Sequence, residues 1–287
     1  MKSYIYILLT IFLLVSCNDK SDIDFVVYEP KIVVEGYIEN EAYSSVLLSV
    51  SASMTGPKDT LNLLNHVIKS AKVTVSDGDV SEILILQTNN NKIPPYEYRG
   101  SLLRGEVGKT YSLKIEYDGK IITSTTYIPQ PVALDSIWFK KAFPEDTIGY
   151  INIKFKNTST DYYQISTCKY PNETIFTPCL YGNIDPKIYP KNADVSMQIN
   201  KGPVLFPKPS YITYFKLSDE TLIKFSTQTK EGYLFWTSFQ NEVLNTQNPI
   251  FPANSNLVSN IEGGNAIGIW SGIGSNVYLL THGKISE

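Results

Sequence analysis

The sequence predicts an all-β protein built from two consecutive β domains. Short segments such as 71–76 and 111–117 alternate apolar and polar residues, which places one face of each segment on a core and the other in water. Asp-Gly pairs at 77–78 and 118–119 favour positive φ and therefore predict hairpins between such segments. Helical periodicity is rare along the chain, which favours β-sandwich architecture over a parallel α/β sheet.

A proline pair separates the two predicted domains. Pro129 and Pro131 deny main-chain donors to any central strand position. The first domain, residues 31–128, has the size of an immunoglobulin-like or transthyretin-like β-sandwich. The second, residues 133–287, contains more prolines between its predicted strands. We therefore expect it to be a loop-rich β domain.

One segment of the second domain has the periodicity of a helix. Between residues 230 and 246, Tyr233, Trp236, Phe239 and Val243 fall three or four positions apart, as they would along one side of a helix. The Asn-Pro pair that follows at 248–249 ends the pattern. We therefore expect one helix near residues 230–246.

The first 17 residues have the pattern of a lipoprotein signal peptide. Lys2 precedes a 12-residue apolar run, and the run closes on Leu14-Val15-Ser16-Cys17, a lipobox. An ordinary membrane anchor is the alternative, but a spanning helix needs about 20 apolar residues. The pattern predicts that residues 1–16 are removed and that Cys17 is acylated. Several acyl chains on one cysteine give stable membrane anchoring.

The acylated cysteine is followed by a polar segment without apolar periodicity. Residues 18–24, within the expected tether 17–30, contain three acids directly behind Cys17, which is typical of a flexible tether. The acids also suit a sorting signal of the kind found in surface-exposed lipoproteins. Either function is consistent with the composition.

Charge and aromatic content restrict the partners. The formal net charge is −3 and no Arg-rich or Lys-rich run is present, so we expect no nucleic-acid partner. The chain has 20 Tyr, 12 Phe and 3 Trp, which suit either sheet packing or a glycan- or partner-binding surface. We expect exposed aromatic residues in the segment 170–211, which contains Tyr181, Tyr189 and Phe206.

Catalytic and metal motifs are scarce. His66 and His282 stand in no zinc-ligand spacing, and we expect no metal site and no cofactor. The glycines between 263 and 274 suit hairpin turns better than a phosphate-binding loop. Glu35, Glu97 and Asp135 have the chemistry of a glycosidase acid and base, but the sequence does not place two of them together. Solvated or turn-capping acids are the alternative.

Two cysteines remain after the lipobox. Export places Cys168 and Cys179 in an oxidising compartment, and they lie 11 positions apart in a proline-containing region. We therefore predict a disulfide between them. The alternative is a pair of small buried thiols.

An ordered set of motifs carries a family resemblance. With the lipobox, the set resembles the Bacteroidota outer-membrane lipoprotein family catalogued as domain of unknown function 4249. The motifs lie at residues 32–38 (IVVEGYI), 71–77 (AKVTVSD), 105–117 (GEVGKTYSLKIEY), 134–137 (LDSI), 233–240 (YLFWTSFQ), 259–264 (SNIEGG) and 266–270 (AIGIW). The resemblance implies an anchored, β-rich accessory protein that accompanies TonB-dependent outer-membrane receptors. The family has no established activity.

These observations lead to one functional expectation and one alternative. We expect a non-enzymatic binding or accessory lipoprotein, held on the outer membrane by Cys17 and facing the cell surface rather than the periplasm. Its expected partners are the membrane, through the lipid anchor, and a TonB-dependent receptor. The alternative is an envelope glycan or peptide hydrolase whose carboxylates are assembled only by the fold. The sequence alone assigns no ligand-binding residue.

Overall fold

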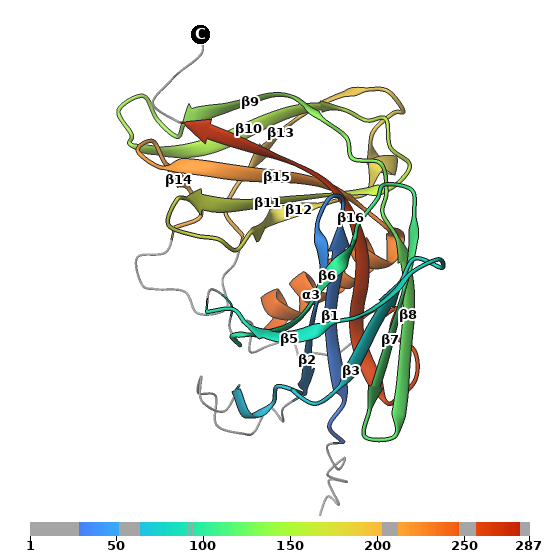
Figure 1. Ribbon diagram of the computed structural model, residues 1–287. Coiled ribbons are helices and arrows are strands. Elements are labelled where there is room, and N and C mark those ends of the chain that lie inside the picture. Colours follow the sequence, from blue (N-terminus) through green and yellow to red (C-terminus); the bar gives the residue numbers. More distant parts are fainter. Residues whose placement is uncertain are drawn as a thin grey trace, which may run out of the picture.

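The all-β prediction is confirmed by the computed structural model, which describes residues 29–51, 64–90, 92, 94–202, 212–246 and 257–281. Most of the chain in these ranges is strand, arranged in three sheets (Figure 1). Cys17, the segment up to residue 28, Phe206 and His282 lie outside the described residues, as does the predicted signal peptide, residues 1–16.

An eight-stranded sheet forms the spine of the molecule. Its strand order is β12-β11-β15-β16-β1-β2-β6-β5, and all neighbours are antiparallel except β1 and β16, which are parallel. The strands are β1 (Ile32–Glu39), β2 (Tyr43–Val50), β5 (Ile85–Thr88), β6 (Tyr96–Arg104), β11 (Tyr162–Tyr170), β12 (Thr177–Ile184), β15 (Glu220–Gln228) and β16 (Ala266–Thr281).

A four-stranded sheet covers one half of this spine and makes the first sandwich. Its order is β4-β3-β7-β8, with β3 (Lys72–Ser76), β4 (Ser81–Ile83), β7 (Thr110–Tyr117) and β8 (Lys120–Tyr127). Alternate residues of β1 and β7 enter one core that contains Val34, Ile38, Leu113 and Ile115. Asp118 and Gly119 have positive φ in the turn between β7 and β8, so the predicted hairpin is formed as its sequence requires.

A second four-stranded sheet covers the other half of the spine. Its strands are β9 (Leu134–Lys141), β10 (Ile148–Lys156), β13 (Asp194–Ile199) and β14 (Phe215–Lys216), and β10 lies between the others. A separate core lies under it, where the rings of Phe155, Tyr163 and Phe225 pack with centroids 4.8–5.4 Å apart. A short 3-10 helix, Pro186–Ile188, leads from β12 toward β13.

The last strand belongs to both sandwiches. β16 is 16 residues long; its first half pairs with β1, up to Ile273, and its second half pairs with β15. In Figure 1 it runs from the lower sandwich into the upper one. The predicted boundary at residues 128–133 separates the strands of the two cores, but residues 266–273 return to the first sandwich.

Glycines near the end of the chain allow β16 to pass close to the linker between the two sandwiches. Gly268, Gly272 and Gly274 lie inside β16, so the expectation that they form hairpin turns is wrong for them. A Cβ on Gly272 would lie 2.0 Å from the carbonyl oxygen of Tyr127, and one on Gly274 would lie 2.0 Å from that of Pro129. The linker between the sandwiches therefore crosses β16 at a distance that only glycine allows.

A helix lies against the spine where the two sandwiches meet. The helix α3 spans Lys230–Thr246, the range expected from its periodicity, and contacts β16, β11 and β12. Tyr233 stacks on Tyr162 with ring centroids 4.4 Å apart, and Trp236 stacks on Tyr37 at 6.4 Å. Its aromatic side thus covers sheet surface that would otherwise face water.

Candidate functional site

The predicted disulfide is not formed. Cys168 and Cys179 are both free and buried, because they point to opposite faces of the sheet. Cys179 lies in the core of the second sandwich with its Sγ 3.9 Å from Oγ1 of Thr167, whereas Cys168 faces the other side and donates to the carbonyl oxygen of Glu173 at 3.0 Å. Adjacent residues of a strand alternate faces, so neighbouring strands do not by themselves bring two thiols together.

The three carboxylates considered as an acid–base pair lie on three different strands. Glu35 is on β1, Glu97 on β6 and Asp135 on β9. Glu35 is exposed and accepts a hydrogen bond from the hydroxyl of Tyr37 at 2.9 Å. Asp135 is exposed on the second sandwich. The structure therefore provides no acid–base pair from these residues.

Glu97 is the buried member of the three. Its side chain is 3% exposed and accepts hydrogen bonds from Ser45, Asn89 and Lys92, and Arg99 lies 3.7 Å away. Burial raises the pKa of Glu97, but the bonds from Lys92, Ser45 and Asn89 outweigh it and lower the pKa to about 2. A carboxylate held in this way stays ionised at neutral pH, which suits a structural ion pair rather than a proton donor.

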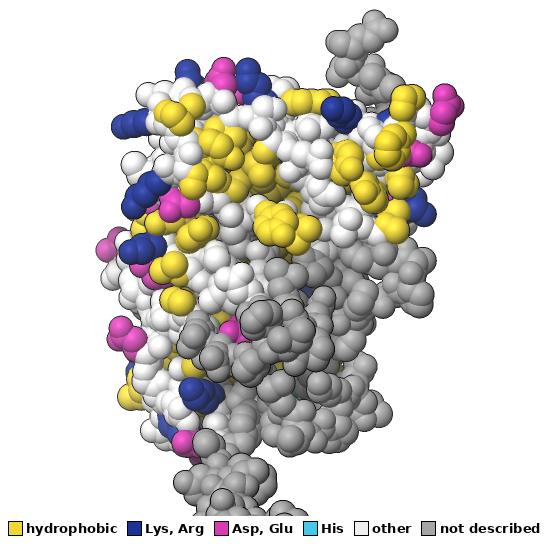
Figure 2. All heavy atoms as spheres, turned by 180° about the vertical axis from the view of Figure 1, so that it is seen from behind, with side chains coloured by type: hydrophobic (Ala, Val, Ile, Leu, Met, Phe, Trp, Pro, Cys, Tyr) yellow, Lys and Arg dark blue, Asp and Glu magenta, His cyan; other side chains and the backbone are white. Residues whose placement is uncertain are grey.

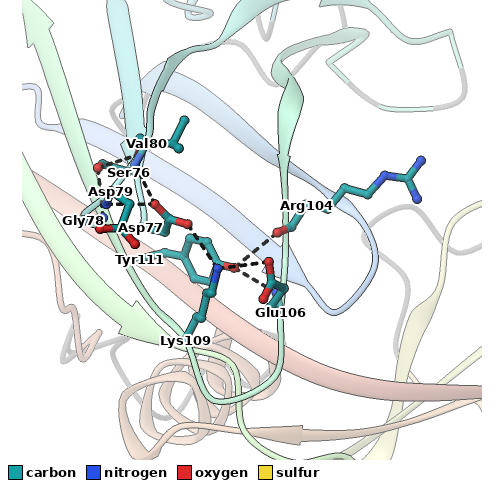
Figure 3. Close-up of polar contacts among 9 residues, drawn as sticks. All are labelled: Ser76, Asp77, Gly78, Asp79, Val80, Arg104, Glu106, Lys109 and Tyr111. Atoms are coloured by element: carbon teal, nitrogen blue, oxygen red, sulfur yellow. Dashed lines mark hydrogen bonds and ion pairs between the residues drawn. The ribbon is translucent and has the colours of Figure 1, made fainter.

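The motif at 105–117 builds a corner of the first sandwich (Figure 3). The hydroxyl of Tyr111 accepts from the amide of Glu106 at 2.8 Å and donates to the carbonyl of Arg104 at 3.2 Å. Nζ of Lys109 lies 3.0 Å from Glu106 and 3.5 Å from Asp77. Figure 3 shows these side chains pointing toward one another rather than into a cavity. The motif is explained by the fold, because it fastens a loop to the turn after β3.

The structure exposes one of the aromatic residues expected at the surface and partly buries another. Tyr181 is 76% exposed, whereas Tyr189 is partly buried against the second core. Phe143 and Ile188 add further exposed apolar surface on the second sandwich. Figure 2 shows hydrophobic side chains gathered over the upper half of one face of the molecule, at the height of the second sandwich in Figure 1.

A cavity of about 170 Å³ lies at one end of the second sandwich. Four strands reach it, because β11 contributes Thr167, β12 contributes Thr177, β14 contributes Phe215 and β15 contributes Thr221. Lys201, two residues after β13, completes the wall. The cavity therefore lies between the two sheets, where the core gives way to polar side chains.

The charged groups of the cavity are paired except for one. Lys169 forms an ion pair of 2.8 Å with Asp219 and donates its amide to Glu173 at 2.9 Å. Within the described part of the chain, no carboxylate lies at ion-pair distance from Nζ of Lys201; the nearest ring is Phe215, with its centroid at 5.5 Å. Burial lowers the pKa of Lys201, although Asp219 and Glu173 oppose the shift.

This cavity has no signal in the sequence. Lys169, Lys201 and Asp219 follow no motif, and their positions relative to one another depend on the pairing of β11 with β15. His66, a metal ligand considered from the sequence, belongs to no such site: the described residues contain no group of three His, Cys, Asp or Glu side chains that could hold an ion. In the same ranges, no helix has the length and apolar character needed to cross a membrane.

Comparison with known proteins places the chain in a family. No curated protein matches it. The model of a family described as domain of unknown function, DUF4249, matches residues 19–275. This range begins just after Cys17 and includes both sandwiches, α3 and most of β16. The resemblance to domain of unknown function 4249 is thereby confirmed, and the protein belongs to the DUF4249 family.

Proposed function

We propose that this protein is a lipid-anchored binding or accessory lipoprotein of the outer membrane, that it faces the cell surface, and that it serves a TonB-dependent uptake system without catalysing a reaction. The observation that carries the proposal is the signal sequence that ends in Leu14-Val15-Ser16-Cys17. Acylation of Cys17 would make the first residue of the mature chain its membrane attachment.

The start of the fold supports attachment through a tether. Residues 18–30 lie between the acylated cysteine and β1, which begins at Ile32 in the middle of the eight-stranded sheet. Thirteen extended residues span roughly 45 Å. Such a tether allows either sandwich to reach a neighbouring membrane protein, and an exposed residue such as Tyr181 suits a protein contact.

The side-chain chemistry supports binding rather than catalysis. Glu97, the buried one of the three candidate carboxylates, accepts several hydrogen bonds and has a pKa of about 2. The cavity of the second sandwich is lined by hydroxyls, two lysines, two carboxylates and Cys168, whose thiol donates to a main-chain carbonyl rather than to a base. These features suit recognition of a ligand.

Two measurements test the proposal. Protease added to intact cells should cleave the protein, whereas a periplasmic control protein should stay intact. Affinity purification of the detergent-solubilised protein should recover a TonB-dependent receptor, and the Cys17→Ser variant should recover less. Full protection from protease would contradict surface exposure. Turnover of an envelope glycan or peptide by the purified protein would replace this proposal with the hydrolase.

A further inference from the structure

The cavity of the second sandwich has donors without partners. The hydroxyls of Thr177 and Thr221 form no hydrogen bond with any described residue, although Thr221 is only 3% exposed. Lys201 adds an ammonium that lacks a carboxylate partner in the described ranges. Three residues with donor groups thus line the same space of about 170 Å³.

Partial burial makes an unpaired ammonium unfavourable. A cation that leaves water loses hydration free energy unless an anion or hydrogen-bond acceptors replace the water. The neighbouring Lys169 is compensated by Asp219, at 2.8 Å. Lys201 has only the ring of Phe215, at 5.5 Å, and a ring at that distance replaces little of the lost hydration. Two lysines and two carboxylates line the cavity, but Glu173 accepts from the amide of Lys169, so the ammonium of Lys201 is the one charged group there without a polar partner among the described residues.

We infer that this cavity binds the carboxylate of a small organic acid, with Lys201 as its counter-ion and the hydroxyls of Thr177 and Thr221 as hydrogen-bond donors. The inference deepens the proposed function, on which it rests, because it assigns a ligand class to a binding protein. The ring of Phe215 provides an apolar wall for the carbon skeleton of the acid.

Charge and size select a carboxylate among the small anions. Because Glu173 and Asp219 also line the cavity, an anion with a single charge is opposed less by these carboxylates than a phosphate ester, which carries about −1.5 to −2 at neutral pH. A cavity of about 170 Å³ is close in size to one that holds benzene, at about 150 Å³. It therefore accommodates an acid of a few carbon atoms, or the terminal carboxylate of a peptide whose remaining residues lie outside.

Binding should depend on the protonation of Lys201. Because burial lowers the pKa of this lysine, the free site loses its charge at a lower pH than an exposed lysine does. A bound carboxylate stabilises the ammonium, so it must raise the pKa of Lys201, and protonation must in turn strengthen binding. This reciprocal effect distinguishes a counter-ion from a residue that only shapes the cavity.

The test uses the full chain, purified in detergent, with its lysines dimethylated by a carbon-13 label that preserves their charge. The signal of Lys201 is identified by its absence in Lys201→Met. Propionate should shift this signal in a saturable way and raise its pKa. Propionamide, the neutral analogue of the same size, should not. Inorganic phosphate should bind at least tenfold more weakly than propionate.

Calorimetry on variants supplies an independent readout. Lys201→Met should weaken propionate binding about tenfold to a hundredfold, and Thr221→Val about threefold to tenfold, as expected for a charged and a neutral hydrogen bond. The matched control Lys140→Met removes an exposed lysine of β9 and should change the Kd less than twofold. Lys201→Met should fold, because methionine removes an unpaired charge and keeps most of the volume.

The outcomes separate the inference from the proposed function. Equal shifts with propionate and propionamide, tighter binding of phosphate, or an unchanged Kd in Lys201→Met would overturn the carboxylate site while leaving the membrane anchor and the receptor untouched. A tighter Kd for trialanine than for propionate would identify the carboxylate as a peptide terminus. A weaker one would identify a free acid.

Discussion

The indole Nε1 of Trp270 donates a hydrogen bond of 3.0 Å to the main-chain carbonyl of Tyr111. Trp270 is on β16 and Tyr111 is on β7, so this bond joins the two sheets of the first sandwich. Both side chains are fully buried. The ring of Trp270 also packs on Gly36, where any Cβ would lie 2.8 Å from it. A residue near the end of the chain thus occupies the centre of the first core.

We expect Trp270→Phe to lower the free energy of unfolding by about 2–3 kcal/mol, because the carbonyl of Tyr111 loses its partner and the smaller ring leaves a cavity. Urea unfolding monitored by circular dichroism measures the change. Trp138→Phe, on a partly exposed tryptophan of β9, is the matched control and should cost less than about 1 kcal/mol. Equal effects of the two variants would argue against the role given to Trp270.

Replacement of Cys17 tests the anchor. Cys17→Ser should abolish incorporation of labelled palmitate and move the protein from the detergent phase to the aqueous phase, because serine cannot accept the thioether-linked lipid. Cys168→Ser, at a buried cysteine of the folded part, should keep both properties. Labelling and partitioning that persist in Cys17→Ser would show that the lipobox is misread.

The two remaining thiols should be free and unreactive in the folded protein. Burial raises the pKa of Cys179 to about 12 and that of Cys168 above its usual value, and the thiolate is the reactive form. At pH 8 we therefore expect slow alkylation by iodoacetamide, followed by rapid alkylation of both thiols in urea without a reductant. Peptide mass spectrometry checks each site. A cross-linked pair of peptides from the non-reduced protein would show instead that Cys168 and Cys179 form a disulfide.

The buried carboxylate of Glu97 should make stability depend on acid pH. Its pKa of about 2 in the folded protein lies below its ordinary value of 4.5, so its contribution is fully present above pH 4.5 and is lost as the pH falls toward 2. We expect Glu97→Gln to cost about 2 kcal/mol at pH 7 and far less at pH 2.5.

Urea unfolding at both pH values measures this difference. The exposed Glu145 provides the matched variant Glu145→Gln, whose free energy of unfolding should stay within about 0.5 kcal/mol of the parent protein at each pH. A cost for Glu97→Gln that is as large at pH 2.5 as at pH 7 would contradict the ionised state of the buried carboxylate.

Local pattern accounts for the strands but not for their partners. The alternation at residues 71–76 becomes β3, and the Asp-Gly pair at 118–119 becomes the turn between β7 and β8. Such signals act over a few residues and are readable from one chain. The pairing of β1 with β16 joins Ile32 to Ala266, and nothing in either segment specifies the other. Long-range pairing of this kind is therefore outside what periodicity predicts.

The positions of the two cysteines and of the cavity side chains also depend on long-range pairing that periodicity does not predict. The pairing of β11 with β12 shifts register between Gln164 and Ser166, and a shift of one residue moves every later side chain to the other face. The sequence does not reveal that shift, so it cannot tell whether Cys168 and Cys179 meet. Likewise, the sequence does not predict that Lys201 lines a cavity, because that position depends on strands that are distant in the sequence.

The position of β16 also governs the order in which the protein can mature. Synthesis delivers the chain from its amino end, yet the first sandwich stays open beside β1 until residues 266–273 arrive. Closing a loop of about 230 residues is slow compared with forming a local hairpin. The amino-terminal half therefore emerges incomplete, with an unpaired strand edge that invites association with other chains. The topology itself therefore leaves the edge of β1 unprotected until the last strand has been synthesised.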